Sequence, residues 1–139
     1  MTQSEIKSKY SGIQTDFELA YHYSCLFLCL LSIAEEAAGI ELDFITERKT
    51  CLEKGWLLKD YTCKDQTAML SYWTGKKWAR RIVQTLPAEI LQNQYTVQKW
   101  YNRQTKYTHF KRRYFDSLEN SKTVANGKIL EYYIYTMED

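Results

Sequence analysis

The chain has 139 residues, with 19 basic and 17 acidic side chains and a formal net charge of +2 at pH 7. This length fits one domain, residues 1–139, with a real core, and the balanced charge does not favour a nucleic-acid partner. Cys25 and Cys29 lie one turn apart in an apolar run, which indicates reduced thiols and an intracellular protein rather than two disulfides. The polar residues 1–7 lack a signal-peptide pattern, and the apolar run 25–34 is too short to span a bilayer. We therefore expect a cytoplasmic protein with no membrane partner.

Helices are predicted in the first half of the chain. The first extends from Cys25 to Ala38, with Ser24 as its N-cap and Gly39 as its stop. Its first turns are apolar on nearly all sides, which predicts a central, enclosed helix. Two more helices are expected at 42–54 and 64–73, joined by a short extended connection at 56–61.

Strands are predicted in the second half, where the apolar residues recur with a period of two. The expected strands are 77–84, 95–101, 107–115 and 128–135. Asn126-Gly127 is a strong turn signal before the last of them. Helices first and strands later predict an α+β fold, in which the helix starting at Cys25 packs on a C-terminal antiparallel sheet of four or five strands.

Three residues suggest thiol chemistry. Cys25 stands at a predicted helix start, where the positive end of the helix dipole favours the thiolate. His109 lies on a predicted strand and Asp116 on the next extended segment, so the histidine can act as a base and the carboxylate can orient its ring. Each residue also has a plainer interpretation: a small core cysteine, a satisfied strand histidine and the first residue of a turn. His22, three residues before Cys25, is a rival base.

Gln14 is a candidate donor for stabilising an oxyanion, because its side-chain amide carries N–H groups; a surface glutamine is the alternative. The cysteines and histidines do not have the spacing of a metal site, since no Cys-x-x-Cys occurs. No phosphate loop or dinucleotide fingerprint is present either. We therefore expect no metal and no cofactor.

A group of basic residues suggests a second kind of partner. Among aromatic residues, such side chains can form a positive face that binds single-stranded nucleic acid, although solvated strand faces use the same residue types. The group comprises Lys76, Lys77, Arg80, Arg81, Lys106, Lys111, Arg112 and Arg113.

Several segments together resemble a small family found in spirochaetes, on their plasmids, and in prophages. They are Ile13-Gln14, Ser24-Cys25-Leu26-Phe27-Leu28-Cys29-Leu30, Gly55-Trp56, Asp60, Thr108-His109-Phe110, Phe115-Asp116-Ser117, Asn120-Ser121, Val124, Gly127-Lys128-Ile129 and Tyr132. That family is similar to papain-like cysteine peptidases, near the bacteriocin-processing and cell-wall-hydrolase branches. The resemblance implies a papain-like fold with Cys25 as nucleophile, His109 as base and Asp116 as the orienting acid. It departs from papain-like enzymes at Leu19, where they carry the oxyanion glutamine, and at Ser24, where glycine is common.

The sequence therefore predicts a thiol-dependent hydrolase of peptide or peptidoglycan-like amide bonds that uses Cys25, His109 and Asp116, with Gln14 as a possible helper at the oxyanion. The alternative is a non-catalytic papain-like binding module of a mobile element or prophage that recognises a host protein, because a fold does not guarantee catalysis. Nucleic-acid binding through the basic and aromatic strand surface is a third interpretation. The sequence does not specify the substrate or the oligomeric state.

Overall fold

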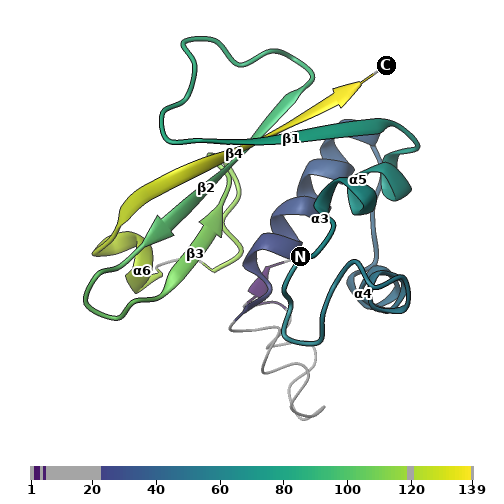
Figure 1. Ribbon diagram of the computed structural model, residues 1–139. Coiled ribbons are helices and arrows are strands. Elements are labelled where there is room, and N and C mark those ends of the chain that lie inside the picture. Colours follow the sequence, from purple (N-terminus) through teal and green to yellow (C-terminus); the bar gives the residue numbers. More distant parts are fainter. Residues whose placement is uncertain (1, 4, 6–22, 119–120, 139) are drawn as a thin grey trace.

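A computed structural model describes residues 2, 3, 5, 23–118 and 121–138. The predicted α+β class is confirmed, with α3 and α5 next to the sheet and α4 farther from it (Figure 1). The named helices are α3 (Cys25–Ala38), α4 (Phe44–Glu53), α5 (Gln66–Thr74) and α6 (Lys122–Ala125). The strands are β1 (Lys77–Val83), β2 (Gln94–Tyr101), β3 (Thr108–Lys111) and β4 (Lys128–Glu138).

Helix α3 has the bounds predicted from the sequence. Gly39 ends it in the left-handed conformation, at φ 65°, and donates its N–H to the Glu35 carbonyl at 2.9 Å. Ser24 occupies the N-cap position, but its side chain does not cap the helix. Phe27 is fully buried and packs against rings from the neighbouring helices, with its centroid 5.8 Å from Phe44 and 5.9 Å from Trp73. The prediction of an enclosed central helix is confirmed.

Helices α4 and α5 begin two residues later than predicted because each has an aspartate cap. Asp43 accepts a hydrogen bond from the Thr46 N–H at 2.9 Å, and Asp65 accepts one from the Ala68 N–H at 3.1 Å. The predicted extended connection at 56–61 is wrong. The chain there folds into a tight turn closed by an antiparallel bridge between Leu57 and Cys63.

The described strands form one antiparallel sheet in the order β1-β4-β2-β3. The longest strand, β4, therefore lies inside the sheet, and the short β3 forms one edge. Trp100 of β2 pairs with His109 of β3, which fixes the register of the candidate base. Within the described residues, no helix is long and apolar enough to cross a membrane.

One prediction about the C-terminal part is wrong. The strand expected at 107–115 ends at Lys111, and an antiparallel bridge between Arg112 and Phe115 then reverses the chain. The turn predicted at Asn126-Gly127 is present, and Asn126 caps the C-terminus of the short helix α6 there. Gly127 is needed there for space, because an added Cβ would lie 2.0 Å from the Thr123 carbonyl oxygen.

Candidate functional site

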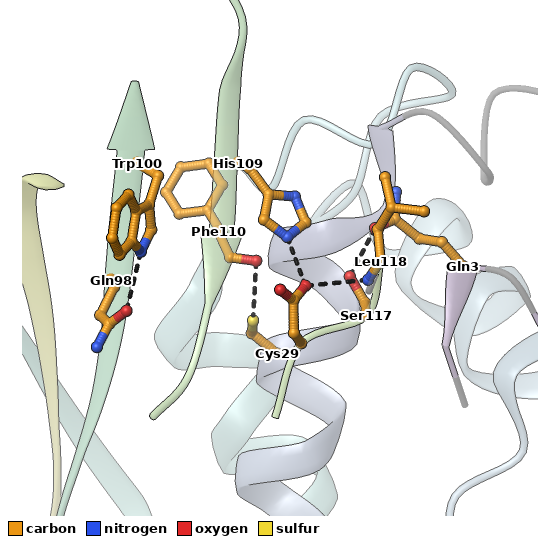
Figure 2. A network of polar contacts seen from close by, with 9 residues as sticks. Gln3, Cys29, Gln98, Trp100, His109, Phe110, Ser117 and Leu118 are labelled. Atoms are coloured by element: carbon orange, nitrogen blue, oxygen red, sulfur yellow. Dashed lines mark hydrogen bonds and ion pairs between the residues drawn. The ribbon is translucent and has the colours of Figure 1, made fainter. Parts of the chain in front are cut away.

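The edge strand β3 lies along one stripe of α3. Four residues of that helix, three or four positions apart, face the strand: Cys25, Cys29, Ser32 and Glu36. The Cys29 thiol donates to the Phe110 carbonyl at 3.6 Å (Figure 2). Arg112 donates to the Ser32 hydroxyl at 3.1 Å and also pairs with Glu36. These contacts between α3 and residues 109–112, called the α3–β3 seam, cover the edge of the sheet. They bring the start of α3 next to His109.

His109 and Asp116, seven residues apart in the sequence, form a direct ion pair. His109 Nε2 lies 2.7 Å from Asp116 Oδ1, and only 5% of the histidine side chain is exposed. Figure 2 shows the His109 ring pointing from β3 toward the segment that contains Ser117 and Leu118. The prediction that these two residues meet is thus confirmed by geometry.

The Asp116 carboxylate is held in place by its own backbone segment. The turn closed by Arg112 and Phe115 returns the chain alongside β3, and the Leu118 N–H donates to Asp116 Oδ1 at 3.0 Å. One carboxylate oxygen therefore accepts from both the imidazole and the backbone. Such hydrogen bonding stabilises the ionised carboxylate.

The N-terminal segment is hydrogen-bonded to the loop that contains Asp116 and Ser117. Gln3 and Ser117 are both fully buried. The Gln3 N–H donates to the Ser117 carbonyl at 2.6 Å, and the Ser117 hydroxyl donates to Gln3 Oε1, also at 2.6 Å (Figure 2). These two bonds join residues 114 positions apart and limit the movement of the residue next to Asp116.

Cys25 is the second group that interacts with the His109 ring, and this interaction raises the pKa of the histidine. Because Nε2 is occupied by Asp116, the other ring nitrogen, Nδ1, is the one available to the thiol. Burial by itself lowers the pKa of His109, but the hydrogen bonds to Asp116 and Cys25 outweigh burial and raise that pKa to about 9. At neutral pH the imidazole is therefore protonated and lies between a carboxylate and a sulfur atom.

The ionised state of Asp116 matches this arrangement. Burial raises the pKa of Asp116, yet the hydrogen bonds from His109 and from the Leu118 N–H hold it below its ordinary value. A carboxylate, an imidazole and a cysteine sulfur in this order, with the ring holding the proton that the sulfur gives up, are the requirement for an activated cysteine nucleophile.

Cys25 is almost buried, with 7% of its surface exposed, but it lines a pocket of about 270 Å³. The pocket lies between the start of α3, the turn at 57–63 and strand β3. Its described walls carry no charged side chain; they include Tyr23, Leu26, Tyr61, Cys63, Thr108 and Phe110. A small reagent or one uncharged side chain can therefore approach the thiol.

The start of α3 offers N–H groups for a developing oxyanion. The first N–H groups of a helix have no partner within the helix, and the Ser24 side chain does not cap them. The predicted glutamine donor, Gln14, and the rival base, His22, both lie outside the described residues.

Two other kinds of site considered from the sequence can be compared with the structure. No group of three or more His, Cys, Asp or Glu side chains that could hold a metal ion occurs in the part of the chain that the structure describes. The basic residues are divided between the two edges of the sheet. Lys76, Lys77, Arg80 and Arg81 lie on or beside β1, while Lys111, Arg112 and Arg113 lie on or beside β3, at the opposite edge of the sheet.

Two residues of the site have no signal in the sequence. Cys63 reaches the pocket because of the turn at 57–63, and no local sequence motif predicts that turn. Gln3 stands in a polar segment that we expected to be only a lead-in, yet it is buried against Ser117. Both positions depend on contacts between segments far apart in the chain.

Comparisons of this chain with protein-family models, with curated proteins and with solved structures gave no significant match.

Proposed function

We propose that the chain is a thiol-dependent hydrolase of amide bonds in peptides or peptidoglycan-like substrates. One observation carries the proposal: the buried His109 imidazole is paired with Asp116 at 2.7 Å, and Cys25, at the start of α3, lies close enough to the same ring to raise its pKa. A histidine with a purely structural role would not need a cysteine beside it. Here the neighbouring cysteine stands at a helix start and also lines a pocket. The combination is what nucleophilic catalysis by cysteine requires.

In this mechanism the Cys25 sulfur attacks the carbonyl carbon of the substrate as the thiolate, and the proton it has given up is the one that His109 holds. The His109 imidazolium then gives its proton to the departing amine, and the carbon–nitrogen bond breaks to leave a thioester on Cys25. Neutral His109 next takes a proton from water, which attacks the thioester and releases the acid. Asp116 keeps the ring oriented and stabilises its positive charge throughout.

The oxyanion of each tetrahedral intermediate is stabilised by the backbone N–H of Cys25, with the positive end of the α3 dipole behind it. Gln14 stays a predicted second donor. The pocket has uncharged walls, so the residue that enters it is uncharged, because burying a charge without a partner is costly.

The order of elements also supports a papain-like fold for this chain. A helix carries the thiol at its N-terminus, and an antiparallel sheet later in the chain carries the histidine, followed by the acid. This is the order in the papain-like cysteine peptidases that the sequence resembles. Likeness of fold alone does not give an activity, so the proposal depends on the site.

The test is the formation of a thioester on Cys25. The whole chain is mixed with the p-nitrophenyl ester of N-acetylphenylalanine, an activated acyl donor with an uncharged side chain, and the acylated residue is identified by mass spectrometry. We expect a thioester on Cys25 and continued release of nitrophenol. His109→Ala should slow both steps by about 100-fold or more, which is typical for loss of a general acid or base. Uncharged peptide amides and peptidoglycan fragments are then compared as substrates.

Cys51→Ser is the matched control, because Cys51 is another buried thiol, on α4, away from the pocket. It should leave the rates unchanged, and Cys25→Ser should abolish thioester formation. Turnover that persists in Cys25→Ser, or a chain that is folded but never acylated at Cys25, would overturn the hydrolase in favour of a non-catalytic binding module.

A further inference from the structure

A second thiol lines the Cys25 pocket. Of the four cysteines, all of which the structure describes, only Cys25 and Cys63 belong to its walls. Cys29 is fully buried and directs its thiol to the Phe110 carbonyl, and Cys51 is fully buried on α4. The proposed mechanism gives Cys63 no task.

The turn at 57–63 holds Cys63 in the pocket wall. The bridge between Leu57 and Cys63 is flanked by hydrogen bonds from the Leu58 N–H to the Thr62 carbonyl, 3.0 Å, and from the Lys64 N–H to the Trp56 carbonyl, 2.8 Å. Inside the turn, Tyr61 adopts the left-handed conformation, with φ 69°. A tyrosine rarely takes this conformation, and such strain is maintained only where the surroundings enforce it.

Tyr61 is fixed by contacts on its ring and hydroxyl. The ring is buried and stacks on Phe44 with an interplanar angle of 13°, and the Arg48 guanidinium donates to the hydroxyl at 2.8 Å. The backbone carbonyl of Tyr61 accepts the Cys63 thiol at 3.7 Å. The strained turn therefore positions Cys63 beside the pocket.

We propose that Cys63 is a resolving thiol, which traps peroxide-oxidised Cys25 as an intramolecular Cys25–Cys63 disulfide and so shuts the site reversibly. The proposal uses the same activated Cys25 as the proposed function but does not require hydrolysis. Its ligand is a small hydroperoxide, such as hydrogen peroxide, which the pocket of about 270 Å³ can admit.

The chemistry takes place in two steps. The Cys25 thiolate attacks one peroxide oxygen, so that a sulfur–oxygen bond forms and the oxygen–oxygen bond breaks; the hydroxide that leaves takes the proton held by His109 and becomes water, and the neutral His109 ring takes up a proton from solvent afterwards. The Cys63 sulfur then attacks the Cys25 sulfenic acid; the sulfur–sulfur bond forms, the sulfur–oxygen bond breaks, and the hydroxyl leaves as water with the Cys63 proton. Two thiols lose two electrons in total, and one peroxide is reduced to two waters.

The electrostatics of the pair set the order of these steps. Burial raises the pKa of Cys63, and the neighbouring negative charge on Cys25 raises it further. Cys63 therefore stays a protonated, poorly reactive thiol until Cys25 has been oxidised. Oxidation of Cys25 to the neutral sulfenic acid removes that charge and makes Cys63 easier to deprotonate when it is needed.

The experiment treats the whole chain with hydrogen peroxide and maps its cysteines by mass spectrometry without reduction. We expect a Cys25–Cys63 cross-linked peptide, and Cys25 should become alkylatable again after dithiothreitol. In Cys63→Ser, Cys25 should proceed to the irreversible sulfinic acid, so that alkylation recovered after reduction falls several-fold. Cys29→Ser, which keeps a donor for the Phe110 carbonyl, and Cys51→Ser are the controls and should behave like the wild type.

The alkylation rate of Cys25 before peroxide separates this inference from the proposed function. Fast alkylation without a Cys25–Cys63 link, or a link to Cys29 instead, overturns the resolving role and leaves the activated thiol intact. Slow alkylation without a link overturns both. If Cys63→Ser does not fold, the presence or absence of the Cys25–Cys63 disulfide in peroxide-treated wild type decides whether Cys63 is the resolving thiol.

Discussion

His109 combines burial with positive charge, which is an unusual state for a histidine. Burial alone would favour the neutral ring, so the raised pKa of about 9 measures how strongly Asp116 and Cys25 hold the proton. The charge is useful for expelling an amine, because the proton for the leaving group is already in place. It also ties the stability of the fold to pH.

The sign of that pH dependence follows from the shift in pKa. The pKa of His109 is about 9 in the folded chain, against an ordinary value of 6.5, so the folded state holds the proton more tightly. The resulting stabilisation is fully present below pH 6.5 and is lost as the pH rises through about 9. It amounts to on the order of 3 kcal/mol.

Asp116→Asn should remove much of this effect, since asparagine keeps the shape of the side chain but not the charge. In a nuclear magnetic resonance titration of the His109 ring, the midpoint should move from about 9 toward 6.5. The free energy of unfolding should then change less between those two pH values than it does in the wild type. Asp60→Asn, the same change on the exposed tip of the turn at 57–63, is the control. An unchanged His109 midpoint in Asp116→Asn would show that the ion pair does not set the charge of the ring.

At the scale of elements, the seam between α3 and β3 is what assembles the site. Cys25, Cys29, Ser32 and Glu36 form a stripe on the helix that contacts His109 and Phe110 on β3 and Arg112 directly after it. The seam also covers the free edge of the sheet, where an unpaired strand is otherwise prone to pair with another chain. Stability and site geometry thus depend on the same contacts.

Gly127 follows α6 and lies against the backbone of both α6 and β2. An added Cβ would lie 2.0 Å from the Thr123 carbonyl oxygen and 2.7 Å from that of Tyr101. Gly127→Ala should therefore destabilise the fold by about 3 kcal/mol or more, since both obstacles are backbone. Urea unfolding followed by tryptophan fluorescence measures the loss.

Gly75→Ala is the matched control for that prediction. Gly75 has φ +70°, but an added Cβ meets nothing within 4 Å, so only the left-handed conformation is penalised, by about 1–2 kcal/mol. Equal losses in the two variants would contradict the steric explanation for Gly127.

The elements that the sequence predicted best are those with local chemical signals. The apolar run and Gly39 define α3, and alternation defines β2 and β4, so their bounds differ little from the prediction. The reversal between Arg112 and Phe115 was missed because Arg113-Tyr114 contains no usual turn residue. Asn126-Gly127 correctly indicated a turn before β4, but the short helix α6 that precedes it was not predicted.

The candidate site was predictable only in part. Cys25, His109 and Asp116 could be selected because a helix start, a strand and a following acid have chemical meaning without a structure. Cys63 and Gln3 could not be selected, since their roles come from packing between distant segments. Long-range contacts of this kind leave no periodic or compositional trace.

At the scale of the whole molecule, the site joins three separate parts of the chain. Its residues come from the start of α3, the turn at 57–63 and the segment 108–118. The bond between Gln3 and Ser117 adds the N-terminal segment to this group. Cys25 and Cys63 line one small pocket, and Cys25 also interacts with His109, the only histidine among the described residues, which is paired with Asp116.

The central claim is that His109 activates Cys25, and the rate of Cys25 alkylation tests it most directly. The rate is measured with iodoacetamide from about pH 5 to about pH 10, with mass spectrometry to identify the alkylated residue, in the wild type and in His109→Ala. The account predicts rapid alkylation of Cys25 already at neutral pH in the wild type, slowed about tenfold or more by His109→Ala. Slow alkylation that His109→Ala leaves unchanged would mean that Cys25 is an ordinary packed thiol, and would contradict the account.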